Sequence, residues 1–183
     1  MDIVIREARN DELDAAGELT ARVYLEGGLL LQGADDPYFA ELRDAVRRAA
    51  HADVLVAVES GAADGDGSGG RIVGSVTFVG RGGEFADLAG PGEAEFRMLA
   101  VDPRARGRGV GEALVRECLR RAGEVGARRV VLSSQSQMHT AHRLYGRLGF
   151  DRAPDLDWEP VPGVRLHAFA HELSDPSRDD HNI

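Results

Sequence analysis

Lysine is absent from this sequence of 183 residues, and all 22 of its basic residues are arginines. Acidic residues number 31, so the formal net charge is −9. A basic face dominates the affinity of proteins for nucleic acids and anionic membranes, so this balance predicts neither partner. The missing lysine also excludes a P-loop, which needs Gly-Lys-Ser/Thr to place a lysine on bound phosphates.

Cysteine and long apolar runs are also scarce. The single Cys118 excludes an intramolecular disulfide framework and a Cys-rich zinc site. Because it shares a helical face with Val110, Leu114 and Ala122, we expect a small buried apolar residue instead of a nucleophile. No apolar run approaches membrane length, and the first residues become charged too early for a signal peptide. These absences predict a cytoplasmic protein.

Length and composition fit one globular domain, which we expect over residues 1–173, followed by a polar tail over 174–183. Hydrophobic periodicity predicts the element order β-α-α-β-β-β-α-β-α-β-β. The glycine-rich stretch 61–70 is expected to be a hairpin loop between two strands. A helix separates the strand that ends at Val101 from the strand that begins at Arg129. These two strands should therefore be parallel, joined by a right-handed crossover.

A loop rich in glycine and arginine, Arg106 to Gly111, lies between an apolar segment that ends at Val101 and an amphipathic helix. Glycines let the backbone curl with its N–H groups pointing inward, and the start of the helix adds unpaired N–H groups and a positive dipole end. This combination predicts a phosphate or pyrophosphate site. A dinucleotide fingerprint does not fit, because Glu112 occupies the place of its third glycine. A basic surface turn is the alternative.

A second motif lies downstream, where the residues from Ala141 to Phe150 read AHRLYGRLGF. Together the two motifs resemble the GNAT superfamily of acyl-CoA N-acyltransferases. Arg106, Gly109 and Gly111 match the family's R/Q-x-x-G-x-G/A pyrophosphate loop, and the second motif is similar to its A-x-x-L-Y-x-x-x-G-F signature. The resemblance implies an α+β fold. Its mixed, mostly antiparallel sheet has a central parallel strand pair splayed around the CoA site and is flanked by about four helices.

The resemblance also implies an activity. It identifies an N-acetyltransferase that moves an acetyl group from acetyl-CoA, its co-substrate, to a primary amine by direct attack in a ternary complex. The acceptor would be a small-molecule or peptide amine, and a homodimer is a common assembly in the family. The all-arginine composition agrees with a bacterial source. The alternative is a non-catalytic acyl-CoA-binding or acyl-CoA-sensing module on the same fold.

Family positions assign the cofactor-binding residues. The backbone of the strand from Met98 to Val101 would pair with pantetheine, as an added strand pairs with the edge of a sheet. The N–H of Leu99 would hold the thioester oxygen. Met138 stands where many members carry an asparagine that contacts the pantetheine arm, and Ser133, Ser134 or Gln135 would have to replace that contact. The predicted cofactor-binding set is Met98, Leu99, Ala100, Val101, Arg106, Gly107, Arg108, Gly109, Val110, Gly111, Ser134, Met138 and Tyr145.

Glu95 and Tyr145 are the catalytic candidates. Glu95 lies where some family members carry the carboxylate that deprotonates the amine. Tyr145 matches the tyrosine near the CoA sulfur, and a phenol with a reference pKa of about 10 can donate a proton to the thiolate at neutral pH. Alternatives stay open for both. Glu93, Glu95 and Arg97 alternate onto one strand face and could form a polar face or an ion pair, and Tyr145 could be a core aromatic residue.

The acceptor site is expected between the first two helices, the loop at 80–92 and the last hairpin. Packing is the alternative role for its candidate lining residues, and for the first two helices plain helix packing is equally open. His139 and His142 lie on one helix without an evident third ligand, so we expect no metal there. The candidate lining residues are Tyr24, Asp36, Tyr38 and Trp158.

Overall fold

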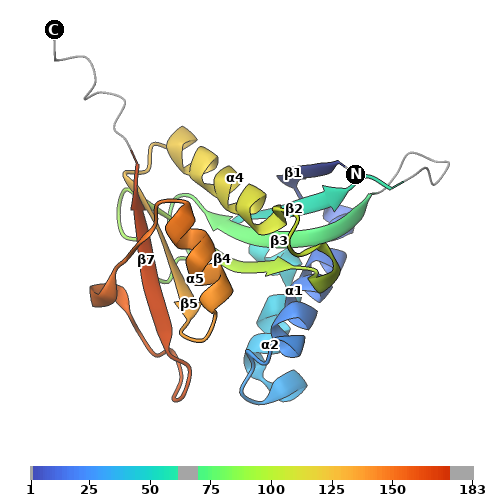
Figure 1. Ribbon diagram of the computed structural model, residues 1–183, viewed down its shortest axis with the longest axis horizontal. Coiled ribbons are helices and arrows are strands. Elements are labelled where there is room, and N and C mark those ends of the chain that lie inside the picture. Colours follow the sequence, from blue (N-terminus) through green and yellow to red (C-terminus); the bar gives the residue numbers. More distant parts are fainter. Residues whose placement is uncertain (1, 62–69, 174–183) are drawn as a thin grey trace, which may run out of the picture.

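A seven-stranded sheet with the order β1-β2-β3-β4-β5-β7-β6 organises the molecule (Figure 1). The computed structural model describes residues 2–61 and 70–173, so most of the predicted loop at 61–70 and the predicted tail at 174–183 lie outside the described residues. The strands are β1 (Ile3–Glu7), β2 (Asp53–Glu59), β3 (Arg71–Val79), β4 (Glu93–Val101), β5 (Arg129–Gln135), β6 (Asp151–Arg152) and β7 (Leu166–Glu172).

The helices are α1 (Leu13–Glu26), α2 (Pro37–Arg43), α3 (Ala45–Ala49), α4 (Val110–Glu124) and α5 (His139–Arg147). Short 3₁₀ turns precede some of them, including η2 (Gly33–Asp35) before α2 and η3 (Pro103–Ala105) before α4. No helix of the described segments is long and apolar enough to cross a membrane. The predicted order of elements and the α+β class are confirmed.

One predicted helix is divided in the structure. The predicted order has two helices between the first two strands, but the second of them is split, because α2 ends at Arg43 and α3 begins at Ala45. Asp44 leaves the helical conformation with φ −83° and ψ 66°, and its carboxylate accepts a hydrogen bond from the N–H of Arg47 at 2.9 Å. Asp44 therefore acts as an N-cap, which competes with continuation of the helix.

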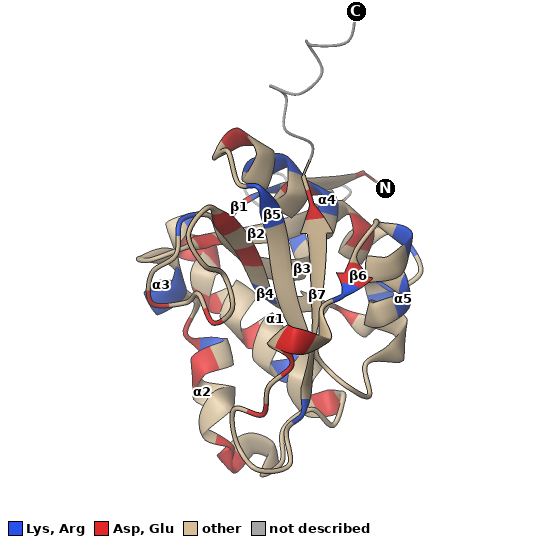
Figure 2. Ribbon diagram, turned by 90° about the vertical axis from the view of Figure 1, so that its left-hand side faces the viewer, with Lys and Arg blue, Asp and Glu red and all other residues tan. Residues whose placement is uncertain are grey.

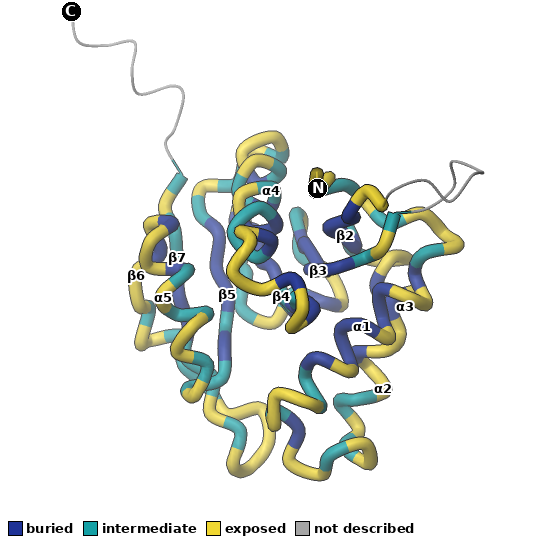
Figure 3. Tube along the Cα trace, turned by 45° about the vertical axis from the view of Figure 1, so that its right-hand side comes forward, coloured by how far each residue is buried: buried dark blue, intermediate teal, exposed yellow. Residues whose placement is uncertain are grey.

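Strand β2 is buried on both faces, which explains why its sequence is almost continuously apolar. Leu55 and Ala57 pack in the same core cluster as Leu114 of α4. Val54 and Val56 point the other way and pack against α1 and α3. Figure 3 shows the buried inner sides of α1 and α4 on either side of the strands. Cys118 of α4 is fully buried in the first cluster, so its prediction as a packing residue is confirmed.

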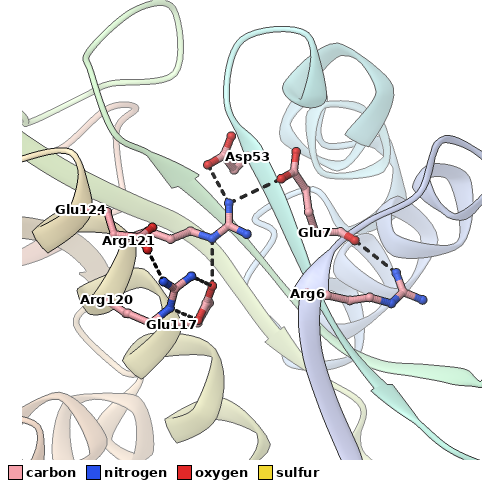
Figure 4. A network of polar contacts seen from close by, with 7 residues as sticks. All are labelled: Arg6, Glu7, Asp53, Glu117, Arg120, Arg121 and Glu124. Carbon is pink, nitrogen blue, oxygen red and sulfur yellow. Dashed lines mark hydrogen bonds and ion pairs between the residues drawn. The ribbon is translucent and has the colours of Figure 1, made fainter.

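An ion-pair network attaches α4 to the far edge of the sheet (Figure 4). The Arg121 guanidinium lies 3.1 Å from the Asp53 carboxylate and 3.4 Å from that of Glu7, and its Nε lies 3.0 Å from Glu117. Partly exposed pairs of this kind contribute roughly 0–1 kcal/mol each. They mainly fix the position of α4, and with it the glycine loop (Arg106 to Gly111) at the N-terminus of this helix.

The central strands β4 and β5 are parallel, as predicted, but they pair only at one end. Their register joins Glu93–Glu95 to Arg129–Val131, and beyond these residues the strands separate. Met98 has a φ of 57°, the one left-handed conformation among the described non-glycine residues. This conformation costs roughly 1–2 kcal/mol and accompanies an irregularity in the β3–β4 ladder. The predicted splay of the parallel pair is therefore confirmed.

Candidate active site

Two cavities meet where β4 and β5 separate. The first has a volume of about 580 Å³ and lies between α2, the separated strands and the connection before β7. The second, of about 910 Å³, lies between the glycine loop and α5. Both are lined by Tyr24, Leu29, Leu99 and Met138. A molecule held in the gap between the strands would therefore reach both cavities.

The glycine loop forms one wall of the second cavity. Gly107 and Gly109 adopt left-handed conformations with φ of 74° and 78°, which glycine accepts without steric cost, and Gly109 is the N-cap of α4. The first N–H groups of a helix have no partner within the helix, so they remain available to an anion. The predicted residues Val101, Arg106, Gly107, Gly109, Val110 and Gly111 all line this cavity.

Two other predicted residues of this region do not line either cavity. Arg108 turns back to β2, where its guanidinium lies 2.7 Å from the Glu59 carboxylate. Ala100 is buried against Leu19 and Val23 of α1 and is in register with Ser75 of β3. Among the arginines of the loop, Arg106 is the one that lines the cavity. A salt bridge to a distant strand leaves no local signal in the sequence, so the orientation of Arg108 was not predictable.

The backbone between the cavities has no ladder partner. The β3–β4 register passes from Arg97 to Ala100 and skips Met98 and Leu99. On the other side of β4, the pairing with β5 ends at Glu95. Leu99 lines both cavities, and Met98, which packs against Leu30 and Leu42, lines the first. A strand edge of this kind can bind an extended ligand through its N–H and C=O groups.

Tyr145 lies on α5 with only 3% of its surface exposed and lines the first cavity. Its ring centroid lies 5.9 Å from that of Phe96, 6.0 Å from that of Phe150 and 5.7 Å from that of Phe169. Burial raises the pKa of its hydroxyl well above the usual range, so the phenol keeps its proton throughout the neutral range. The residue is thus part of the aromatic core and of the cavity wall at once.

Glu95 occupies a different environment from Tyr145. Its side chain is fully buried, and its Oε2 accepts hydrogen bonds from the N–H groups of Asp87 at 2.8 Å, Leu88 at 3.1 Å and Ala89 at 3.3 Å. It lines neither cavity. Burial raises the pKa of its carboxyl, and the hydrogen bonds from Leu88 and Ala89 oppose that rise. The structure does not bring the two catalytic candidates together in one cavity.

Glu93 and Arg97, the neighbours of Glu95 on the same strand face, also bind the loop at 80–92 before β4. The Glu93 carboxylate accepts a hydrogen bond from the N–H of Gly90 at 2.8 Å and pairs with arginines at the start of β5. The Arg97 guanidinium donates to the carbonyl of Phe85 at 3.1 Å and lies 2.9 Å from the Asp87 carboxylate. The alternating pattern therefore forms the polar face that was the alternative to a catalytic role.

A contact between Ser134 and His142 was not anticipated. Ser134 is buried at the end of β5 and lines the first cavity, and its Oγ lies 3.2 Å from Nε2 of His142 and 3.5 Å from the sulfur of Met138. Burial lowers the pKa of His142, and His167 and His139 lower it further, so the imidazole is mainly neutral at pH 7. The predicted residues Ser134 and Met138 thus lie together at the strand gap.

The predicted acceptor-side residues all line the first cavity, namely Tyr24, Asp36, Tyr38 and Trp158. Asp36 is also the N-cap of α2, because its carboxylate accepts a hydrogen bond from the N–H of Tyr38 at 3.0 Å. The sequence did not reveal the contribution of residues 29–32, which Gln135 connects to β5 through a 2.9 Å hydrogen bond to the Leu29 carbonyl. Neither periodicity nor a motif marks this segment.

Solved structures share this fold. A GNAT-family acetyltransferase from Staphylococcus aureus superposes with a TM-score of 0.70 over 94% of this chain and 100% of its own, at 15% identity. A putative acetyltransferase from Salmonella typhimurium, solved with its cofactor acetyl-CoA, has a TM-score of 0.67 at 20% identity and covers both chains fully. A GCN5-related N-acetyltransferase from Kribbella flavida has a TM-score of 0.63 at 26% identity, over 93% of this chain and 98% of its own.

Sequence relatives match shorter segments. A mycothiol acetyltransferase from Cellulomonas flavigena is 39% identical over 97 residues, which cover 51% of this chain and 28% of the relative. An N-acetylaspartate synthetase from Xenopus tropicalis is 33% identical over 104 residues, which cover 57% of this chain and 35% of the relative. The matched segments thus span less than half of each relative. The model of the acetyltransferase (GNAT) family matches residues 27–150, about two thirds of the chain. The chain therefore belongs to the acetyltransferase (GNAT) family.

Proposed function

We propose that this protein transfers an acetyl group from acetyl-CoA to a primary amine by direct attack in a ternary complex. The observation that carries the proposal is the gap between β4 and β5, which joins a cavity walled by left-handed glycines to a cavity that contains Tyr145. The similarity to a structure solved with acetyl-CoA supports this cofactor. The acceptor, a homodimer, a cytoplasmic location and a single domain over 1–173 stay predictions.

The second cavity and the strand gap each bind a different part of acetyl-CoA. The pyrophosphate of CoA binds the N–H groups of Gly107 to Gly111, with Arg106 opposite its charge. The pantetheine arm runs along the unpaired backbone of Met98 and Leu99 as an added strand. The thioester then lies at the gap, near Ser134 and Tyr145, where the two cavities meet.

The chemistry follows from these positions. The neutral amine nitrogen attacks the thioester carbon and forms the C–N bond, and the N–H of Leu99 stabilises the oxyanion. When the intermediate collapses, the C–S bond breaks and the thiolate takes a proton from Tyr145, which later regains one from solvent. Direct attack fits the single Cys118, because burial raises the pKa of its thiol and removes it from any acceptor. The proton of the attacking amine needs a separate acceptor.

A pair of substitutions at Glu95 tests whether this residue accepts the proton of the attacking amine. Glutamine keeps one oxygen for the N–H groups of residues 87–89 but cannot take a proton, whereas alanine removes both functions. We propose a loop-holding role, so Glu95→Gln should retain most of kcat, while Glu95→Ala should raise KM for the amine. The measurement is steady-state CoA release with each variant.

The base role predicts a different result for the same pair. Both variants would then lose kcat, by about 10²–10⁴-fold. The wild-type rate would also rise with pH through a value above the ordinary glutamate pKa of about 4.3, because burial raises the pKa of Glu95 and the carboxylate must be ionised to accept a proton. A large loss of kcat in Glu95→Gln at an unchanged melting temperature would overturn the loop-holding role.

Substitution of Gly109 tests the pyrophosphate site. No atom lies within 4 Å of the position of an added Cβ, so Gly109→Ala introduces backbone strain at φ 78° but no clash. The strain of about 1–2 kcal/mol corresponds to roughly tenfold weaker acetyl-CoA binding if the loop must keep this conformation to bind. Calorimetry and the rise in melting temperature with acetyl-CoA both report this change.

Gly123→Ala is the matched control for Gly109. Gly123 lies inside α4 and likewise has no atom within 4 Å of an added Cβ, but it has an ordinary helical conformation. We expect unchanged acetyl-CoA affinity and a slight gain in stability. Equal affinity of the Gly109 and Gly123 variants would contradict the assigned pyrophosphate site. A wild-type protein whose melting temperature acetyl-CoA does not raise would contradict the whole proposal.

A non-catalytic acyl-CoA-binding module is the second candidate function. The observation in its favour is the engagement of Glu95 by backbone N–H groups, which leaves no carboxylate of β4 in either cavity except through reorganisation of the loop. Firm binding of acetyl-CoA without CoA release on any amine would support this function over the enzyme.

A further inference from the structure

The first cavity, on the acceptor side of the strand gap, is mainly apolar. Its walls come from the end of α1, the following turn, β7 and the connection before it. At its mouth Leu31 is 61% exposed and Val161 is 50% exposed, two of the four large apolar side chains that are exposed in residues 2–61 and 70–173. The main apolar wall residues are Tyr24, Leu29, Leu30, Trp158, Val164 and Leu166.

The two segments that form this mouth approach each other closely. A Cβ added at Gly163 would lie 3.7 Å from Cδ1 of Leu31, so the turn before β7 lies within about one methyl group of the segment after α1. The hydrogen bond from Gln135 to the Leu29 carbonyl holds that segment against β5. The apolar mouth is therefore built from two fixed segments and is not a chance pair of exposed side chains.

The charges of this cavity favour a cation over an anion. Arg97 is the one basic residue in its lining, and its guanidinium is already engaged by the Asp87 carboxylate and the Phe85 carbonyl. The exposed carboxylate of Glu41 also lines the cavity and forms no ion pair within the described chain. Figure 2 shows further acidic residues in the turn before α2. An acceptor with a carboxylate or phosphate would meet no free cation here.

We propose that the acceptor is a small primary amine with a bulky apolar substituent and no anionic group. Its nitrogen lies at the strand gap, and its apolar body lies against the walls and extends to Leu31 and Val161 at the mouth. Its ammonium form is attracted by Glu41 before it loses a proton. This inference rests on the proposed function and names the class of amine that the same site takes.

A series of n-alkylamines tests the inference, because these amines have nearly the same basicity and differ in apolar length. With acetyl-CoA saturating, kcat/KM should rise by about three- to fourfold for each methylene from propylamine to hexylamine, as expected for burial of a methylene group. Spermidine and glutamate provide polycationic and anionic comparisons. A flat series, or a preference for spermidine or glutamate, would overturn the inference.

Substitutions at the mouth of the first cavity test whether the alkyl chain of the amine binds there. Leu31→Ser and Val161→Ser should reduce the rise of kcat/KM with chain length, because KM for the longer amines increases. The affinity for acetyl-CoA should stay unchanged. Val46→Ser is the matched control, because Val46 is 55% exposed and lines neither cavity. A rise with chain length that neither mouth variant reduces would place the amine elsewhere and overturn the assignment.

The proposed function and this inference fail in different ways. If acetyl-CoA binds but no amine releases CoA, the proposed transferase function fails, and the inference fails with it. If short and long amines are acetylated equally well, the transferase function stands and only the apolar acceptor class is wrong. The rate of CoA release with each amine separates these two results, and calorimetry confirms in both cases that acetyl-CoA binds.

Discussion

Replacing Tyr145 with phenylalanine is expected to lower kcat by at least about 10²-fold, the lower end of the usual contribution of a positioned acid. The hydroxyl is the proton donor that we assign to the CoA thiolate, and phenylalanine removes it while it keeps the ring. The ring contacts with Phe96, Phe150 and Phe169 do not depend on the hydroxyl. The measurement is kcat for CoA release, with single-turnover rates to separate chemistry from product release.

Acetyl-CoA affinity and the melting temperature serve as the controls for Tyr145→Phe, and neither should change. The pH profile supplies a second readout. Because burial raises the pKa of this hydroxyl, the phenol stays protonated up to and beyond its usual value of about 10. Wild-type kcat should therefore not fall through pH 9 from loss of this proton. A variant with wild-type kcat would show that solvent protonates the thiolate.

Replacing Gly17 with alanine is expected to destabilise the protein by about 3 kcal/mol, the upper end of ordinary overpacking effects. Gly17 lies in α1, where α2 ends against it, and an added Cβ would lie 1.9 Å from the carbonyl oxygen and 2.8 Å from the carbonyl carbon of Arg43. Both atoms belong to the backbone, so a side-chain rotation cannot relieve the clash. The two helices would have to separate.

Urea unfolding measures the loss of stability, and the melting temperature should fall by roughly 6–12 °C for a domain of this size. Gly123→Ala is again the control, because it adds the same methyl group to a helix where nothing lies within 4 Å. It should leave the free energy of unfolding unchanged or slightly raised. A Gly17 variant as stable as this control would mean that α2 can move away from α1 without loss of packing.

The α1–α2 contact also forms a wall of the first cavity, which includes Tyr24 of α1 and Tyr38 of α2. The two rings make an edge contact with their centroids 6.3 Å apart. We therefore expect that any folded Gly17→Ala protein binds the amine more weakly, while the glycine loop, which lies on α4, keeps its affinity for acetyl-CoA. Sequence reasoning left open whether these helices line a groove or only pack. In the structure they do both.

The sequence by itself determined those features that depend on local patterns. The period of the apolar residues predicted the order of strands and helices, and a helix between two strands predicted that β4 and β5 are parallel. Gly107 and Gly109 occupy left-handed positions that glycine tolerates best, so the loop was recognisable from residue types alone. The second motif placed Tyr145 on a helix, which is α5 in the structure.

Only the tertiary structure decided what each polar side chain contacts. The alternation of Glu93, Glu95 and Arg97 predicts a shared strand face, but not that the loop before β4 covers this face and binds the Glu95 carboxylate. Arg108 turns to Glu59, which lies in a strand far away in the sequence. Arg48 is almost fully buried, where it donates to Thr77 and to the Glu41 carbonyl, although an arginine usually indicates a surface position.

The cavity that we propose for the amine acceptor could not be predicted for the same reason. Its mouth joins Leu31 and Val161, which are separated by most of the chain and lie in segments without periodicity. Periodicity reports which face of an element is buried, because that choice repeats along the helix or strand. It carries no information on which irregular segments meet over a strand gap, because their contacts depend on long-range packing. The sequence therefore identified the glycine loop that we assign to CoA, and the folded chain was needed to define the cavity that we propose for the amine.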